Sequence, residues 1–470
     1  MSEAQSNVAC PKCGTRLSIY ERRRRFFWQW ALFPDSRRYE CGNCGKTVFF
    51  RSTPAYSSKT PPASTNQDEA PASINTQKAS AEHLARANGT NQSDAEKMFI
   101  DNLGGYLSTS SNSIYPNIAN DNPIGNMPLN ISTLETLTKT ASTQPSTITS
   151  TPEQVHQQLR FPGHFTHYQN TTTVEEEIVE AKKIHKDLRE SISWSIDDFH
   201  KSKQLKLGLI RASTHKLVES MIRNPDSAFL LSKLKDNDDF VYSHPVSTSI
   251  LAVLFGRYMG LSRRELHTLA LATLFLDIGK IQLPRQLLEK RKKLVLGEVA
   301  LLQKHVAYSL DILDTTDITN DVFVAVENHH ERIDGKGYPH HKQDEEIPLF
   351  AKIATIADAY DAITHPRPYR NALSPSSAIS ALGKQRGLQF QEVLLDQFFH
   401  CLGAFPTGSM VILNTGEAGM VIAQNQTNRS QPKVLIFRDN NKGKVISPFM
   451  RDLEAEALNT NGNPIHIKVA

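Results

Sequence analysis

The sequence has no long apolar run, few cysteines and no large excess of charge of either sign. No run reaches the roughly 18 apolar residues of a membrane helix, and no signal-peptide hydrophobic segment opens the chain. Lys and Arg number 53 and Asp and Glu 49, so a net charge of +4 gives no argument for nucleic acid. Only five residues are cysteine, unlike a secreted disulfide framework. We therefore expect a cytoplasmic protein.

At 470 residues the chain exceeds a single hydrophobic core, and its length predicts about two to four domains. Composition and periodicity change along it, and the predicted fold class is mainly α-helical. Four segments are expected: a zinc-ribbon-like module over 1–51, a disordered linker over 52–160, a helical bundle domain over 161–402, and a small β subdomain over 403–470.

Four of the five cysteines form two CxxC pairs, Cys10–Cys13 and Cys41–Cys44, each followed by glycine. This spacing lets two thiolates reach one tetrahedral zinc ion, and four cysteines leave no open position. The pattern predicts a structural zinc site. A redox dithiol and unrelated free thiols are the weaker alternatives.

Between these pairs, Arg22–Arg25 are followed at once by aromatic residues. Such a stretch could stack on bases or lie at an anionic membrane surface. A module of this size has little core of its own, so packing of its aromatics is the preferred interpretation.

The segment over 52–160 is rich in Ser, Thr, Asn, Gln and Pro and poor in aromatics. Such a composition buries too little apolar surface to offset its ordering entropy. We expect a disordered tether, with a short helix possible at Ser93–Leu103.

Apolar residues at three- and four-residue steps predict helices from Thr173 onward, where an N-cap precedes Glu175–Glu177. The further predicted helices are Leu207–Arg223, Ser227–Lys233, His244–Gly260, Glu265–Ile278, Gly297–Leu313, Asp321–His330 and Ile347–Thr364. Beyond Thr407 the period changes, and short β-type runs separated by turn clusters predict three or four antiparallel strands. These runs are Met410–Leu413, Gly419–Ala423 and Val434–Phe437.

The stretch His329–Pro339 reads HHERIDGKGYP. Neutral imidazole is a common metal ligand. Two adjacent histidines cannot face one point from the middle of a regular helix, but they can at a helix end. The Gly- and Pro-containing run that follows them predicts such a helix end. A solvated charged loop is the alternative. Upstream, Asp277 ends the most hydrophobic helix, where a buried carboxylate needs either Lys280 or a metal as its cation.

Further ligand-type residues in the predicted helices are His244, His305, Asp358 and Asp361. Together with His329–Pro339 and Asp277, they resemble the HD-GYP family of bacterial cyclic di-GMP phosphodiesterases, an all-helical branch of the HD metallohydrolases. The resemblance covers roughly 173–402, and the HHExxDGxGYP element is specific to that family. One departure is clear. The name-giving His-Asp pair reads Leu276-Asp277 here.

The resemblance implies a pair of divalent ions, iron, manganese or similar. It assigns Asp277 as the bridge, with His244 and Asp358 completing the first metal. His305, His329 and His330 would complete the second. A glutamate that holds a third ion in some members is Phe240 here, which argues for two.

The implied catalytic residues are Asp277 and Lys280. The implied substrate-binding residues are Lys280, Arg367, Arg370, Asp361 and Tyr338. For the two arginines, a surface turn around Pro366 and Pro368 is the alternative.

The sequence supports three hypotheses about function, and the first is preferred. In the first, the protein hydrolyses cyclic di-GMP, and water or a side chain such as Thr273 replaces the missing histidine as a metal ligand. Alternatively, the chain is a degenerate cyclic di-GMP receptor or a scaffold whose GYP surface binds signalling proteins such as a diguanylate cyclase. In the third, the ribbon acts at nucleic acid, against which its size and the modest net charge argue.

Overall fold

The computed structural model describes residues 36–40, 47–51, 150–234, 240–290, 292–365, 372–459 and 464–469. Several predictions lie outside these residues: the zinc ligands Cys10, Cys13, Cys41 and Cys44, the arginine-aromatic stretch, most of the linker, and Arg367 with Arg370. The chain divides into two units, Met1–Gly89 and Thr90–Ala470.

The first unit contains one described antiparallel strand pair. Strand β1 (Ser36–Glu40) pairs with β2 (Thr47–Arg51), with Ser36 opposite Arg51 and Glu40 opposite Thr47. The second predicted CxxC pair falls between these strands in the sequence. The zinc ribbon itself stays a prediction.

The first described element of the second unit is a short helix that lies within the predicted linker. Helix α5 (Pro152–Gln158) has a capping box between Thr151 and Gln154. Val155 is fully buried, and His156 Nδ1 lies 2.9 Å from the Met259 carbonyl oxygen. The predicted linker therefore extends too far, because this cap and one buried face outweigh the polar composition around them.

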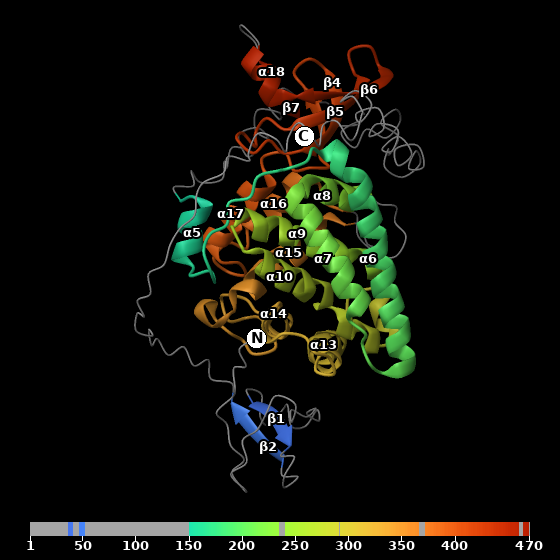
Figure 1. Cartoon of the computed structure of the whole chain (residues 1–470), viewed down its shortest axis with the longest axis vertical. Helices are drawn as coiled ribbons and strands as arrows, with labels where there is room; N and C mark the ends of the chain where they lie inside the picture. The colour runs from blue at the N-terminus through green and yellow to red at the C-terminus, as the bar shows by residue number, and fades with distance from the viewer. Residues whose placement is uncertain are drawn as a thin grey trace, which may run out of the picture. The chain divides into compact units, whose positions relative to one another are not determined.

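After α5, the described part of the unit is a helical bundle followed by a sheet (Figure 1). Its central helix α9 packs against α10, α15, α8 and α6. The helical elements are α6 (Val174–Ser202), α7 (Gly208–Arg223), α8 (Pro225–Lys233), α9 (Phe240–Tyr258), α10 (Arg263–Phe275), η2 (Ile278–Gln282), α11 (Arg285–Leu288), α12 (Leu296–Gln303), α13 (His305–Leu313), α14 (Asn320–Asn328), η3 (Asp344–Glu346), α15 (Leu349–Thr364), α16 (Pro375–Gly383) and α17 (Glu392–Leu402).

Helices α9 and α10 hold much of the apolar core. Ile250 and Phe255 of α9 and Leu266 and Leu269 of α10 are fully buried. Each such side chain contributes about 1.5–3 kcal/mol on burial. This packing fixes the two helices that carry His244 and lead into Asp277. None of the described helices is both long and apolar enough to cross a membrane.

One predicted helix, Gly297–Leu313, is broken at Lys304 into α12 and α13. The break brings the start of α13 directly onto η2. A Cβ atom at Gly279 would lie 2.1 Å from the His305 carbonyl oxygen, so only glycine fits there. Ser309 Oγ accepts from the Gly279 N–H at 2.8 Å and donates to the Leu276 carbonyl at 3.0 Å. His305 therefore begins a helix rather than lying inside one.

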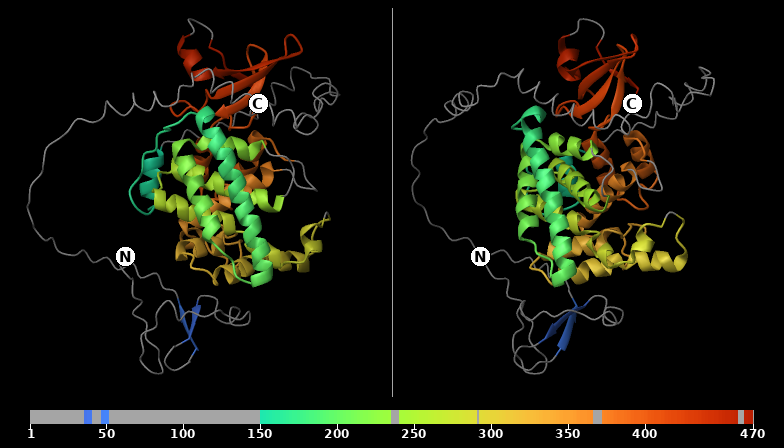
Figure 2. Two further views of the ribbon diagram at one scale, coloured as in Figure 1. Left: turned by 45° about the vertical axis from the view of Figure 1, so that its right-hand side comes forward. Right: turned by 90° about the vertical axis from the view of Figure 1, so that its right-hand side faces the viewer.

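The predicted small antiparallel sheet is confirmed (Figure 2), but it has five strands where three or four were predicted. Their order is β6-β5-β4-β3-β7, and the unpredicted strand β6 contains Pro448, which suits its edge position. The elements are β3 (Met410–Leu413), β4 (Glu417–Ala423), β5 (Lys433–Asp439), β6 (Lys444–Asp452), α18 (Leu453–Asn459) and β7 (Ile467–Val469).

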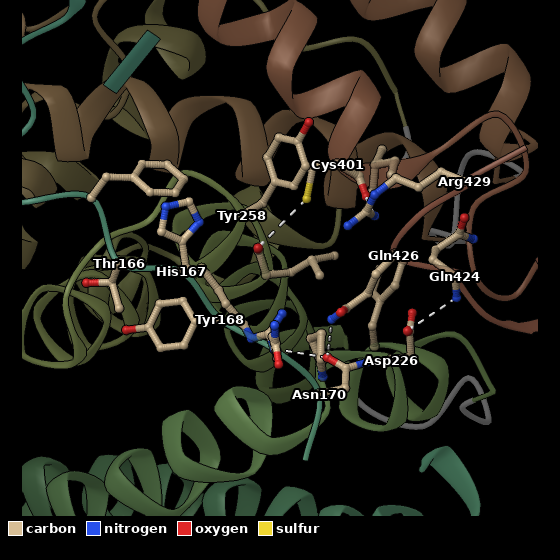
Figure 3. A pocket seen from close by; sticks show the side chains of 17 residues that line it. Thr166, His167, Tyr168, Asn170, Asp226, Tyr258, Cys401, Gln424, Gln426 and Arg429 are labelled. Carbon is tan, nitrogen blue, oxygen red and sulfur yellow. Dashed lines mark hydrogen bonds between the residues drawn. The ribbon is translucent and has the colours of Figure 1, made fainter. Parts of the chain in front are cut away.

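Buried polar bonds attach this sheet to the bundle. Asp226, at the start of α8, accepts from Thr407 Oγ1 at 2.9 Å and from the Gln424 N–H at 3.2 Å. Burial raises the pKa of Asp226. A cavity of about 350 Å³ lies at this junction, with Arg257, Tyr258 and Gln424 among its lining residues (Figure 3).

Candidate metal centre

The six residues expected to bind metal come together in two groups that share Asp277. The first group is His244, Asp277 and Asp358, and the second is Asp277, His305, His329 and His330. Within each group, one ligand atom of every residue lies within 4.8 Å of the others. These residues come from five elements: the first turns of α9, the residue before η2, the start of α13, the end of α14 and the middle of α15.

Two histidines are held in the tautomer that a metal requires. His305 Nδ1 donates to the Leu302 carbonyl and His329 Nδ1 donates to the Val326 carbonyl, each at 2.7 Å. Their Nε2 atoms are therefore unprotonated when the rings are neutral, a pattern typical of metal-ligating histidine.

Three buried polar atoms in this group have no hydrogen-bond partner in the described structure. They are His305 Nε2, His329 Nε2 and Asp277 Oδ1, with the first and last 3.2 Å apart. Leaving one such atom unsatisfied costs about 1–3 kcal/mol. A cation bound between these three atoms would satisfy all of them, so the residues fit a divalent metal.

Burial also keeps these rings neutral. It lowers the pKa of His305 to about 4, against a partly opposing effect of Asp277. Burial likewise lowers the pKa of His329, and it places that of His330 well below its usual range. Neutral imidazoles are ready to bind a metal at neutral pH without first losing a proton.

The pKa of His244 is shifted in the opposite direction. Its Nδ1 lies 2.8 Å from Asp361 Oδ2 and its Nε2 lies 3.0 Å from Asp358 Oδ1. Burial lowers its pKa, but the hydrogen bonds to the two carboxylates outweigh burial and raise the pKa to about 9. In the metal-free chain, His244 is therefore an imidazolium at neutral pH, and a metal at Nε2 would replace that proton.

The Asp277 carboxylate can bind Lys280 and a metal ion at the same time. Its Oδ2 accepts from Lys280 Nζ at 2.5 Å, while Oδ1 points to the unpartnered histidine nitrogens. Burial raises the pKa of Asp277, but Lys280 and His305 outweigh this and hold it well below its usual range. The carboxylate is thus ionised and available as a ligand.

Asp361, which was predicted to bind substrate, lies buried behind His244. Its side chain is completely buried and lies 2.9 Å from His365 Nδ1 and 3.7 Å from Lys233 Nζ, in addition to its bond with His244. This geometry suits orientation of His244. Neither Lys233 nor His365 was predicted: Lys233 is far from Asp361 in the sequence, whereas the four-residue spacing of Asp361 and His365 could have indicated their contact.

The GYP segment is fixed by its own motif residues. Glu331 accepts from the backbone N–H groups of His340 at 2.6 Å and Lys342 at 3.0 Å. A Cβ atom at Gly337 would lie 2.4 Å from the Arg332 nitrogen, so the turn requires glycine. The Tyr338 ring stacks on His330 with centroids 4.7 Å apart. Glu331 therefore shapes the loop instead of adding a ligand.

The departure at Leu276 leaves the first group with one imidazole. Leu276 is 2% exposed. Thr273, considered as a replacement for this histidine, donates its Oγ1 hydrogen to the Leu269 carbonyl at 2.8 Å within its own helix. Water and the Thr273 side chain stay the candidates for the missing ligand.

Comparison with known proteins gives a family match and several curated relatives. Residues 230–392 match the family model described as HD domain. A cyclic di-GMP phosphodiesterase of Pseudomonas aeruginosa is 32% identical over 219 residues, 46% of this chain and 53% of that protein. The cyclic di-GMP phosphodiesterase PdeB of Borreliella burgdorferi is 27% identical over 233 residues, 50% of this chain and 60% of that protein.

A 3'3'-cGAMP-specific phosphodiesterase of Vibrio cholerae is 34% identical over 142 residues, 29% of this chain and 27% of that protein. The chain spans about half the length of the first two relatives. HD domains are divalent-metal hydrolase domains, and the two residue groups above could hold such metals. The helical part of the chain therefore contains an HD domain, is similar in sequence to curated cyclic di-GMP phosphodiesterases, and carries the HHExxDGxGYP element.

Proposed function

We propose that this protein is a metal-dependent phosphodiesterase that hydrolyses cyclic di-GMP. The observation that carries the proposal is the convergence of three unpartnered buried atoms, Asp277 Oδ1, His305 Nε2 and His329 Nε2, beside a second group sharing the same aspartate. The names of the relatives from Pseudomonas and Borreliella support the substrate.

The proposed ligands mix imidazoles with carboxylates, a set that favours first-row transition ions such as iron or manganese over calcium. Metal held by these residues would supply an activated water and would neutralise charge on phosphoryl oxygens. His330 is the remaining ligand of the second set. Asp361 acts as a positioning residue, since it holds His244 through Nδ1 and leaves Nε2 for the metal.

Lys280 is proposed to hold the Asp277 carboxylate ionised and to bind a substrate phosphate. Its ammonium holds Asp277 ionised at 2.5 Å, and its side chain is 34% exposed, so it remains accessible to a phosphate oxygen. Tyr338 keeps His330 in place by stacking and borders the same site. Arg367 and Arg370 are proposed to bind the substrate phosphates as bidentate donors.

The remaining features of the proposal concern the rest of the chain. Cys10, Cys13, Cys41 and Cys44 would bind one structural zinc ion within residues 1–51. Residues 52 to about 149 would form the tether. The helical domain would then begin near 150 and end at 402, ahead of the β subdomain. The GYP surface would contact a diguanylate cyclase or another signalling protein, in the cytoplasm.

A second candidate function is a receptor that binds cyclic di-GMP without hydrolysing it. The observation that favours it is Leu276, a buried apolar side chain where the family has a metal ligand. Among the His, Cys, Asp and Glu residues that the structure describes, the first group then offers His244, Asp277 and Asp358. Specificity for 3'3'-cGAMP, the substrate named for the Vibrio relative, is an outcome that the same assays detect.

The test is a metal count combined with site variants. We expect wild-type protein to hold iron or manganese at the helical site, in addition to the zinc ion bound by the four cysteines. His330→Ala should lower that metal content and abolish hydrolysis, whereas the exposed His200→Ala should change neither. Unchanged metal content in His330→Ala would remove this residue from the ligand set.

A further inference from the structure

A second cluster of metal-ligand residues lies apart from the HD centre, where α7 packs on α10. His215 and Glu219 are four residues apart on α7, and His267 lies in the first turns of α10. Residues with this separation share one helix face. One ligand atom of each residue lies within 4.8 Å of the other two.

The distances within this cluster suit a four-coordinate ion. His215 Nδ1 and His267 Nε2 are 3.1 Å apart, and His267 Nε2 and Glu219 Oε1 are 3.8 Å apart. Ligands about 2.0–2.1 Å from a tetrahedral zinc ion are separated by about 3.3 Å. Small side-chain rotations would therefore bring all three atoms to one ion.

Glu219 has one oxygen to spare. Its Oε2 accepts from Arg263 Nη1 at 2.9 Å, which orients the carboxylate. Its Oε1 is buried and has no hydrogen-bond partner in the described structure. The hydrogen bond between the two histidines and the Arg263 ion pair leave this buried carboxylate oxygen without a partner.

The histidines are also suited to bind a metal. Burial and the neighbouring His215 lower the pKa of His267, which keeps its imidazole neutral at pH 7. The His215 side chain is exposed, so an ion can enter from solvent. Two imidazoles and one carboxylate favour zinc, copper or nickel over magnesium or calcium.

We propose that His215, Glu219 and His267 form a separate site for a divalent transition metal of the zinc type. The three side chains supply three ligands and leave the fourth position open to water or an external ligand. An ion there links α7 to α10. Since His267 precedes Asp277 by ten residues, or about 15 Å of helix, the site is distinct from the HD centre.

The test uses the full-length protein and zinc as the probe. Competition titration with a chromophoric chelator should show one fewer zinc ion per chain in His267→Ala and in His215→Ala than in wild type. His200→Ala, which removes an exposed histidine elsewhere, should keep the wild-type stoichiometry. Zinc should raise the thermal unfolding midpoint of wild type more than that of either cluster variant.

Two further measurements separate this site from the HD centre and from misfolding. In a His330→Ala background, the cluster should still bind its zinc ion, and adding His267→Ala should remove it. Zinc-free His267→Ala should unfold near the wild-type temperature, and its hydrolysis with manganese should be unchanged if the chain is a phosphodiesterase. Equal zinc stoichiometry in wild type and both cluster variants would overturn the proposal.

Discussion

The electrostatics of His244 predict that the metal-free protein loses stability as pH rises from neutral to alkaline values. The His244 imidazolium donates to Asp358 and Asp361, and its pKa is raised to about 9 from an ordinary 6.5. Because the folded-state pKa exceeds the unfolded-state value, the folded state binds the proton more tightly. The stabilisation is fully present below pH 6.5 and is lost as pH rises through about 9.

The size of the effect follows from the two pKa values. One pH unit of pKa difference corresponds to about 1.4 kcal/mol, so the proton on His244 contributes on the order of 3 kcal/mol. Typical domains have a free energy of unfolding of about 5–15 kcal/mol, so the loss should be readily measured. His305 titrates near pH 4 and does not contribute in this window.

The assay is urea unfolding of chelator-treated protein, followed by helical circular dichroism between pH 6.5 and 9.5. His244→Gln cannot take up the proton, so its free energy of unfolding should change less over this range. Manganese should also reduce the change in wild type, because a metal at His244 Nε2 replaces the proton. If wild type and His244→Gln lose equal stability over this range, the assignment of a charged His244 is wrong.

Three further predictions concern the site and its support. Asp277→Asn removes a charge shared by both ligand groups, and metal affinity measured by titration should fall by at least ~10–100-fold; unchanged affinity would exclude a shared ligand. Gly279→Ala places a Cβ against the His305 carbonyl and should cost about 1–3 kcal/mol in unfolding free energy, with loss of metal binding. Asp226→Ala leaves the Thr407 hydroxyl and the Gln424 N–H without their buried acceptor, and should lower the unfolding free energy by about 2 kcal/mol in urea titrations and expose the sheet junction to proteolysis.

The sequence was informative where one local pattern determined the structure. Adjacent histidines ahead of a breaker-rich run predicted a helix end, and α14 ends at Asn328. The cap at Thr173 predicted the start of α6, and the change of period predicted β3, β4 and β5. Each of these features depends on neighbours in the chain.

Features that depend on tertiary packing were missed. The break at Lys304 follows from the close approach of Gly279 to His305, which are 26 positions apart in the chain. Lys233 of α8 reaches Asp361 of α15 only through tertiary packing, whereas His365 lies four residues after Asp361. The buried acceptor at Asp226 likewise meets its donors near the sheet, almost two hundred residues away.

The most direct test of the proposed function is chromatographic analysis of cyclic di-GMP incubated with full-length wild-type protein and excess Mn²⁺ or Fe²⁺. We predict that a linear dinucleotide or GMP is formed, and that Leu276→His raises both metal occupancy and rate. The receptor function predicts instead that wild type binds cyclic di-GMP without forming product, while Leu276→His hydrolyses it. That second result would contradict the proposal that wild type is an active phosphodiesterase.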